Sequence, residues 1–112
     1  MSDLTARLAE YTAALNRYDL DAVEQMFAEG AVYVSPGLNG AISGRAAIMK
    51  AFQAYFTQLT DQVNVDEDVR QLDQHTLEAS WRLQSSKSTR SGRQRITFNA
   101  EGRIARIEVV DD

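Results

Sequence analysis

The chemistry open to this 112-residue chain is limited by its single histidine and its lack of cysteine. Without a thiol, the chain has no cysteine nucleophile, no disulfide framework and no cysteine-ligated zinc site. A site built from several histidines is excluded as well, and a serine–histidine–acid triad would have to use His75. His75 lies in residues 73–76, a stretch typical of an exposed turn, so we expect it to have no functional role.

The acidic run at residues 66–68 is the next candidate for acid–base or metal chemistry. Neighbouring residues of a strand point to opposite faces, so three adjacent acids do not converge on one ion. The run therefore predicts a solvated sheet edge with a bulge in the strand, and no metal site. We expect the protein to use neither a metal nor another cofactor.

The composition is typical of a globular domain, with 44% hydrophobic and 25% charged residues. The length suits one domain over residues 1–112. No apolar run approaches the ~20 residues of a membrane span. The start of the chain lacks the basic region of a secretory signal, so we expect a cytoplasmic protein that does not contact a membrane.

The charge balance also limits the partners of the chain. The net charge of -4 argues against a nucleic-acid binder. Basic residues are nevertheless concentrated in residues 82–106. We interpret this segment as a solvated strand face of arginines, with an anionic partner as the alternative.

The spacing of apolar residues along the chain, together with capping residues, predicts three helices. Leu4, Leu8, Tyr11, Leu15 and Tyr18 follow one another at steps of four and three and so form one helical stripe. A second, shorter helix is predicted to begin after an Asp cap at residue 19 and to end at a glycine at residue 30. A third helix is predicted from the Ser-Gly at residues 43–44 to about residue 59.

Alternation of apolar and polar residues predicts the strands, at residues 31–35, 63–72, 77–84, 93–98 and 104–110. Residues 37–43 are predicted to be a loop, and residues 85–92 a polar connection. Segregated helices and strands are typical of the α+β class. We therefore predict three N-terminal helices packed on the concave side of a curved antiparallel β-sheet, as a cone-shaped roll with an internal cavity.

Several motifs of the chain resemble those of the nuclear transport factor 2-like superfamily, in its SnoaL-like and ketosteroid-isomerase-like branch. These motifs are residues 11–16 with 19–21, residues 26–32, the corner at 35–37, residues 43–48 and residues 98–104. The resemblance covers nearly the whole chain and implies the cone fold. It implies no single reaction, because this fold hosts isomerases, cyclases, hydrolases, dehydratases and non-catalytic modules.

Steroid-isomerase-like members use an aspartate base, while a tyrosine and a protonated aspartate donate hydrogen bonds to the substrate oxygen. The resemblance places Tyr11 at the tyrosine, Ser35 at the base and Gln94 at the second acid. A neutral serine hydroxyl is no carboxylate base. We therefore predict that the protein does not run the steroid-isomerase reaction by that mechanism, and that it does not isomerise a β,γ-unsaturated ketone above background.

The expected cone is apolar and aromatic, with Tyr11, Ser35 and Gln94 as its polar groups and no ionisable acid. Such a pocket suits a small apolar ligand that carries one or two oxygens, whereas simple core packing is the alternative for each aromatic residue alone. The residues predicted to contact the ligand are Phe27, Tyr33, Phe52, Tyr55, Phe56, Trp81, Ile96 and Phe98.

Three functions remain open on the sequence. The protein binds a small apolar molecule, or it is an isomerase, cyclase or hydrolase that polarises a carbonyl with its pocket groups, or it is a non-catalytic dimerisation module. Members of the superfamily commonly dimerise through the outer sheet face, so the resemblance implies a homodimer. A monomer with a charged outer sheet face is the alternative.

Overall fold

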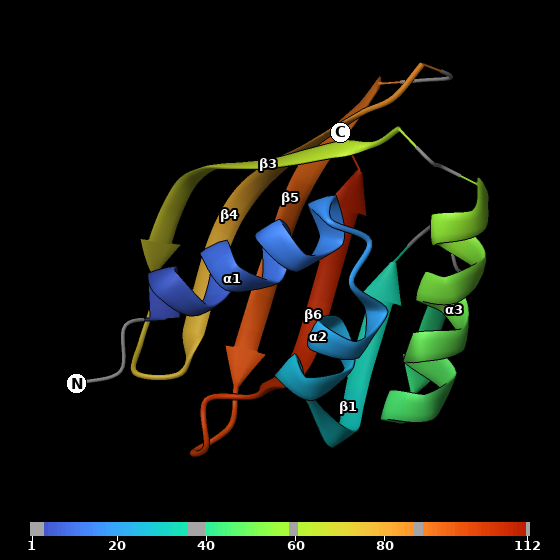
Figure 1. The fold of residues 1–112 in the computed structure, drawn as a ribbon. Coiled ribbons are helices and arrows are strands. Elements are labelled where there is room, and N and C mark those ends of the chain that lie inside the picture. The colour runs from blue at the N-terminus through green and yellow to red at the C-terminus, as the bar shows by residue number, and fades with distance from the viewer. Residues whose placement is uncertain (1–3, 36–39, 59–60, 87–88, 112) are drawn as a thin grey trace.

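The computed structural model describes residues 4–35, 40–58, 61–86 and 89–111. Within these residues the chain forms three helices and six strands (Figure 1). In chain order they are α1 (Leu4–Asn16), α2 (Leu20–Met26), β1 (Phe27–Ser35), β2 (Gly40–Ser43), α3 (Arg45–Gln58), β3 (Val63–Gln71), β4 (Thr76–Gln84), β5 (Thr89–Phe98) and β6 (Ile104–Asp111).

The strands form one open, curved sheet in the order β2-β1-β6-β5-β4-β3. The predicted α+β class and the hairpin-connected run from β3 to β6 are confirmed. The sheet is mixed, however, and not antiparallel throughout, because β1 runs parallel to β6. A parallel pair needs a long crossover connection, which here consists of β2, α3 and the strands β3 to β5.

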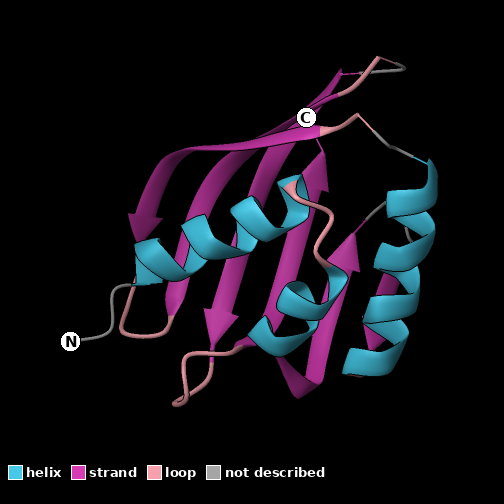
Figure 2. Cartoon of the chain, viewed as in Figure 1, coloured by secondary structure: helices cyan, strands magenta, loops and turns pink. Residues whose placement is uncertain are grey.

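The three helices cover one face of the sheet, as Figure 2 shows. Helix α1 packs on β3 and β4, helix α3 packs on β1 and β2, and α2 contacts both other helices. The core lies between the two layers, because each helix turns its apolar stripe toward the sheet. Its largest fully buried side chains are Leu4, Leu8, Val23, Phe27, Ile48, Leu77, Ile96, Ile104 and Ile107.

Three predicted boundaries are wrong, and strand pairing explains each of them. Helix α2 ends at Met26, not at Gly30, because Phe27 is already extended and pairs with Ile104 of β6. Residues 40–43, predicted as loop, form β2 by pairing with β1. Strand β5 begins at Thr89, so Gly92 lies inside a strand instead of a connection. The predicted end of the third helix at residue 59 lies outside the described residues.

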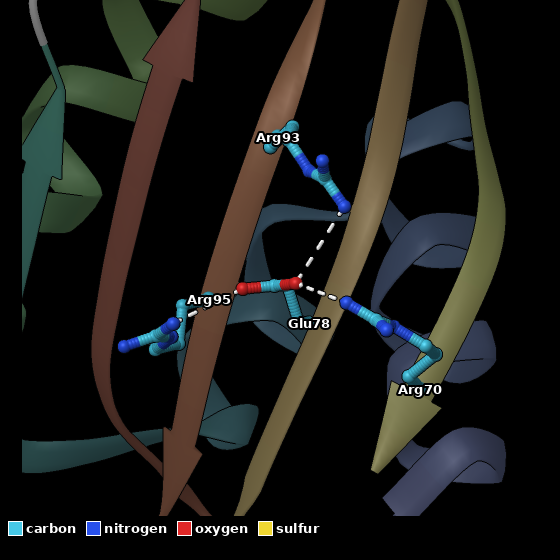
Figure 3. Close-up of polar contacts among 4 residues, drawn as sticks. All are labelled: Arg70, Glu78, Arg93 and Arg95. Carbon is cyan, nitrogen blue, oxygen red and sulfur yellow. Dashed lines mark hydrogen bonds and ion pairs between the residues drawn. The ribbon is translucent and has the colours of Figure 1, made fainter. Parts of the chain in front are cut away.

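The outer face of the sheet carries one carboxylate that is shared by three arginines (Figure 3). Glu78 of β4 lies 2.8 Å from Arg70, 3.1 Å from Arg95 and 3.6 Å from Arg93. Hydrogen bonds from Arg95 and Arg70 hold the pKa of Glu78 below its usual value. The arginine-rich segment thus includes an ion-pair network across β3, β4 and β5, whereas the homodimer expected on this face stays a prediction.

We expect Glu78→Gln to lower the thermal midpoint at neutral pH, because three arginines lose their shared counter-charge. A lowered pKa in the folded state means that the carboxylate stabilises the fold above its unfolded pKa, and that this contribution is lost as the pH falls through the folded pKa. The difference from wild type should therefore shrink in acid. Glu108→Gln, which removes a simple surface pair with Arg106, is the matched control. It should lower the thermal midpoint by less than Glu78→Gln does at every pH. An equal loss in both variants would contradict the network.

Candidate functional site

A pocket of about 490 Å³ lies between the sheet and helices α1 and α3. Its volume falls in the range of small-molecule sites. Phe52 and Phe56 of α3 form one wall, and Tyr33 of β1 and Trp81 of β4 line it from the sheet. The aromatic rings pack on one another, with Tyr33 and Phe52 edge to face at 5.6 Å. The pocket is therefore a largely apolar space against the inner face of the sheet, with aromatic rings on the helix side and on the sheet side.

The structure places Tyr11, Ser35 and Gln94 around this one pocket, and five of the eight aromatic and apolar residues expected beside a ligand also line it. Those five are Tyr33, Phe52, Tyr55, Phe56 and Trp81.

Phe27, Ile96 and Phe98, which we also expected beside a ligand, do not line this pocket. All three are at most 3% exposed. Phe27 packs its ring against that of Tyr11, at 5.9 Å, and Ile96 lies between Leu77 and Ile107 in the sheet. The inner face of the sheet extends beyond the pocket, and at these positions it is filled by core packing.

Asp66 of β3 is the functional candidate that the sequence analysis missed, since we expected no ionisable acid in the pocket. Its carboxylate lines the pocket, accepts a hydrogen bond from the hydroxyl of Thr12 and accepts another from Gln94 Nε2 at 2.9 Å. Asp66 also pairs with Trp81, whose indole lies on the same face. The pocket is therefore lined by a carboxyl group and by the guanidinium-bearing Arg90 of β5, in addition to hydroxyl and amide side chains.

A bulge in β3 explains why Asp66 points inward. The pairing of β3 with β4 shifts register between Glu67 and Arg70, and Asp68 has a φ of 52°. The extra residue changes the alternation, so that Asp66 and Val69 share the inner face although they are three positions apart. The bulge itself was predicted and is confirmed. Combined with the apolar Val69, it was the signal that could have placed Asp66 inside.

Burial sets the protonation of the two central groups. Desolvation raises the pKa of Asp66, while the hydrogen bonds from Thr12 and Gln94 act in the opposite direction. Burial also raises the pKa of Tyr11 well above its usual value, with further contributions from Tyr33 and Asp66. Tyr11 therefore keeps its proton and can donate a hydrogen bond, beside a carboxyl that is easier to protonate than an exposed one.

We expect the stability difference between Asp66→Asn and wild type to depend on pH. A raised folded pKa means that the contribution of Asp66 to stability is fully present below its unfolded pKa and is lost as the pH rises through the folded pKa. The asparagine side chain cannot ionise. The thermal midpoint of Asp66→Asn minus that of wild type should therefore increase as the pH rises through the carboxyl range. Asp68→Asn, the same change at an exposed position of β3, is the control. A difference that falls with rising pH would argue against a desolvated carboxyl.

The other sequence candidates lie away from the pocket. His75 lies in the exposed turn before β4, where its backbone N–H donates to the Asp73 carboxylate. Among the residues that the structure describes, no three His, Cys, Asp or Glu side chains are grouped to hold a metal ion. None of the described helices is long and apolar enough to cross a membrane.

The family model of the SnoaL-like domain matches residues 8–107. The chain belongs to the SnoaL-like domain family. The resemblance noted in the sequence motifs is thereby confirmed. No curated protein matches the sequence of this SnoaL-like chain.

Many solved structures share the fold of this SnoaL-like chain at low identity. The epoxide hydrolase/cyclase-like enzyme SalBIII, described in pyran ring formation in the polyether salinomycin, is 20% identical with a TM-score of 0.82, over 97% of this chain and 90% of that one. TerC, co-crystallised with polyporic acid, is 16% identical with a TM-score of 0.79, over 99% and 92%. An NTF2-like protein from Exiguobacterium sp. 255-15 is 20% identical with a TM-score of 0.80, over 95% and 98%. At these identities the likeness shows the fold alone.

Proposed function

We propose that this SnoaL-like protein binds a small, largely apolar molecule with a carbonyl oxygen, and that Asp66 transfers a proton on it. The single observation that carries the proposal is the position of the Asp66 carboxyl, inside an aromatic pocket and held there by Thr12 and Gln94. A carboxyl whose pKa is raised toward the working pH is the better proton-transfer group.

The proposed reaction needs no oxidant or reductant. The Asp66 carboxylate takes a proton from the carbon next to the carbonyl, the electron pair of the broken C–H bond forms the C=C bond of the enolate, and the π pair of the C=O bond moves to the oxygen. Tyr11, which stays protonated, donates a hydrogen bond to this developing oxyanion. Where the ligand has a C=C bond β,γ to the carbonyl, protonated Asp66 returns the proton to the γ carbon of the dienolate, which gives an isomerisation. Attack of the enolate carbon on a second carbonyl carbon of the same molecule gives a ring closure instead, and the alkoxide formed there takes the proton from Asp66.

Thr12 and Gln94 are positioning residues in this scheme. Their hydrogen bonds each use one oxygen of the carboxylate, Thr12 on Oδ2 and Gln94 on Oδ1. They fix the direction of the carboxylate and keep its pKa from rising further. Ser35 lines the same pocket and remains a neutral hydroxyl, so the base of this scheme comes from a different strand than the steroid-isomerase base. The expected lack of steroid-isomerase turnover rested on the neutral Ser35 at the position of the base and did not take account of a carboxyl on β3.

The fold neighbours agree with a ligand of this kind. SalBIII is named as an epoxide hydrolase/cyclase-like enzyme, and TerC was crystallised with polyporic acid. Both proteins share the fold, with TM-scores of 0.82 and 0.79. They support an oxygen-bearing small molecule as the substrate class, whereas the reaction is inferred from the side chains of this chain.

The experiment that tests the proposal follows deuterium exchange on simple ketones. Cyclohexanone, β-tetralone and a saturated keto steroid are incubated with the protein in deuterium oxide, and loss of the α-proton signals is followed by NMR. We expect the protein to accelerate exchange on at least one probe that also raises its thermal midpoint. Binding of a probe without faster exchange would support a ligand-binding protein and would refute the proposed proton transfer. No binding and no acceleration with any probe would refute the proposal.

A further inference from the structure

Arg90 is the one arginine of β5 whose side chain points to the inner face of the sheet. Strand β5 pairs with β4 without a register shift over residues 89–97, so every second residue shares a face. Gln94 lies on the inner face, because its side chain donates a hydrogen bond to Asp66 in the pocket. Arg90, four positions before Gln94, therefore lies on that face as well. The other two arginines of β5 lie on the outer face, where they reach Glu78 (Figure 3).

Arg90 lies at the rim of the pocket, where the pocket meets solvent. It lines the pocket and is an exposed residue, whereas its cross-strand partner Leu83 lines the same pocket and is buried. Among the described residues, β6 pairs with β5 only as far as Gly92, so Arg90 lies beyond the end of that ladder. An exposed arginine covers apolar surface with its stem and keeps its guanidinium accessible. The charged group is therefore within reach of a molecule that fills the pocket.

Two opposite charges lie at separate places in the pocket. Asp66 and Arg90 carry the only charged side chains among the described residues that line it. Asp66 pairs with Trp81, and Trp81 pairs with Gly92, so Arg90 lies two strands across and two residues along the sheet from Asp66. This offset places their Cα atoms roughly 12 Å apart. An anionic group of a ligand is attracted to the Arg90 end and repelled from the Asp66 end, which sets the orientation of the molecule.

We propose that Arg90 binds a carboxylate of the ligand at the rim of the pocket, while the carbon next to the carbonyl of the same molecule faces Asp66. The substrate is then a keto acid with an apolar body. A guanidinium suits this role, because it stays charged and offers parallel N–H donors to both carboxylate oxygens. This inference rests on the proposed function and narrows its substrate class. The competing explanation is that the stem of Arg90 only covers apolar surface and that its charge serves no ligand.

The first test compares keto acids with their methyl esters, since the members of each pair differ in the charge of one group. One pair is β-tetralone with a carboxylate on its far ring and the methyl ester of that compound. The other pair is dihydrotestosterone hemisuccinate and its methyl ester. A hydrogen bond between charged groups at a solvated rim corresponds to about a tenfold change in affinity. We expect wild type to bind the acid of at least one pair tighter than the ester by about that factor, and this preference should fall as salt is added.

The second test removes the guanidinium. Arg90→Met keeps an unbranched side chain without the charge, and it should lower the affinity for the acid to about that for the ester. Arg90→Lys, which keeps the charge but loses the bidentate fork, should retain part of the preference. Arg82→Met is the matched control, because Arg82 lies on the neighbouring strand β4 and pairs with Glu67 at 2.9 Å. It removes the same charge from the other face of the sheet and should keep the full preference.

The outcomes separate this inference from the proposed function. Equal affinity of wild type for the acid and the ester of each pair would overturn the role of Arg90, as would a preference that persists in Arg90→Met. The α-proton exchange of the esters would then still report on Asp66. An equal loss of preference in Arg90→Met and Arg82→Met would assign the effect to the overall charge of the protein and would also overturn the inference. Binding of no acid and no ester would count against the pocket itself, and so against both proposals.

Discussion

Replacing Asp66 with asparagine is expected to slow proton transfer on a bound ketone by at least about a hundredfold, the lower range for loss of a positioned acid–base group. Asparagine keeps the size of the side chain and can still accept one of the two hydrogen bonds from Thr12 and Gln94. It has no basic oxygen that could take the proton. The pocket should therefore still bind the probe while the exchange of its α-protons stops, so the binding constant changes little and the rate constant falls.

Asp68→Asn is the matched control for this prediction. Asp68 lies two residues further along β3, is exposed and does not line the pocket. Its φ of 52° is a conformation that asparagine also adopts. This variant should exchange ketone protons at the wild-type rate. If Asp66→Asn retained more than a tenth of that rate with the fold intact, another group would be the base and the proposed role of Asp66 would be wrong.

The second large effect is expected for Gly92→Ala, which should destabilise the protein by about 3 kcal/mol or prevent folding. A Cβ atom at Gly92 would lie 1.9 Å from the backbone oxygen of Val110 and 2.8 Å from the indole of Trp81. The first contact is with backbone of the neighbouring strand β6, so relief requires β5 and β6 to move apart where they pair. The second contact pushes Trp81, which lines the pocket.

Gly30→Ala provides the comparison, because a Cβ atom there meets nothing within 4 Å. We expect chemical denaturation to show a large loss of stability for Gly92→Ala and almost none for Gly30→Ala. Trp81 is the only tryptophan of the chain, so its fluorescence reports directly on this wall of the pocket and should shift only in Gly92→Ala. A Gly92→Ala protein with wild-type stability and fluorescence would show that β5 and β6 are not packed as described.

The helices and hairpins of this fold are encoded locally, and this is why the sequence predicts them. The stripe of Leu4, Leu8 and Tyr11 is buried as its spacing requires, and Asp19 caps α2 by accepting a hydrogen bond from the N–H of Ala22. The errors fall where pairing between distant segments decides the structure. Residue 27 joins β1 because β6 pairs with it, and residues 40–43 become a strand because β1 lies beside them.

The site shows the same division between local and distant causes. Tyr11, Ser35 and Gln94 could be placed near one pocket from helical spacing, strand alternation and the family resemblance. Asp66 was missed because strand alternation was applied without the extra residue in the bulge of β3, and a shift of one residue reverses the face to which a side chain is assigned. Gln62, another lining residue, donates its backbone N–H to the hydroxyl of Tyr18, which is 44 positions away in the sequence, and no pattern around Gln62 indicates that contact.

Titration of the Asp66 carboxyl, followed by the carbon-13 chemical shift of its side-chain carboxyl carbon, decides whether the pocket contains a group that can transfer a proton. We expect a pKa above that of an ordinary aspartate in the free protein, because burial outweighs the hydrogen bonds from Thr12 and Gln94. We also expect a ketone probe in the pocket to shift this titration. An ordinary or lowered pKa that no probe changes would mean that Asp66 faces water, and the proton-transfer site would not exist.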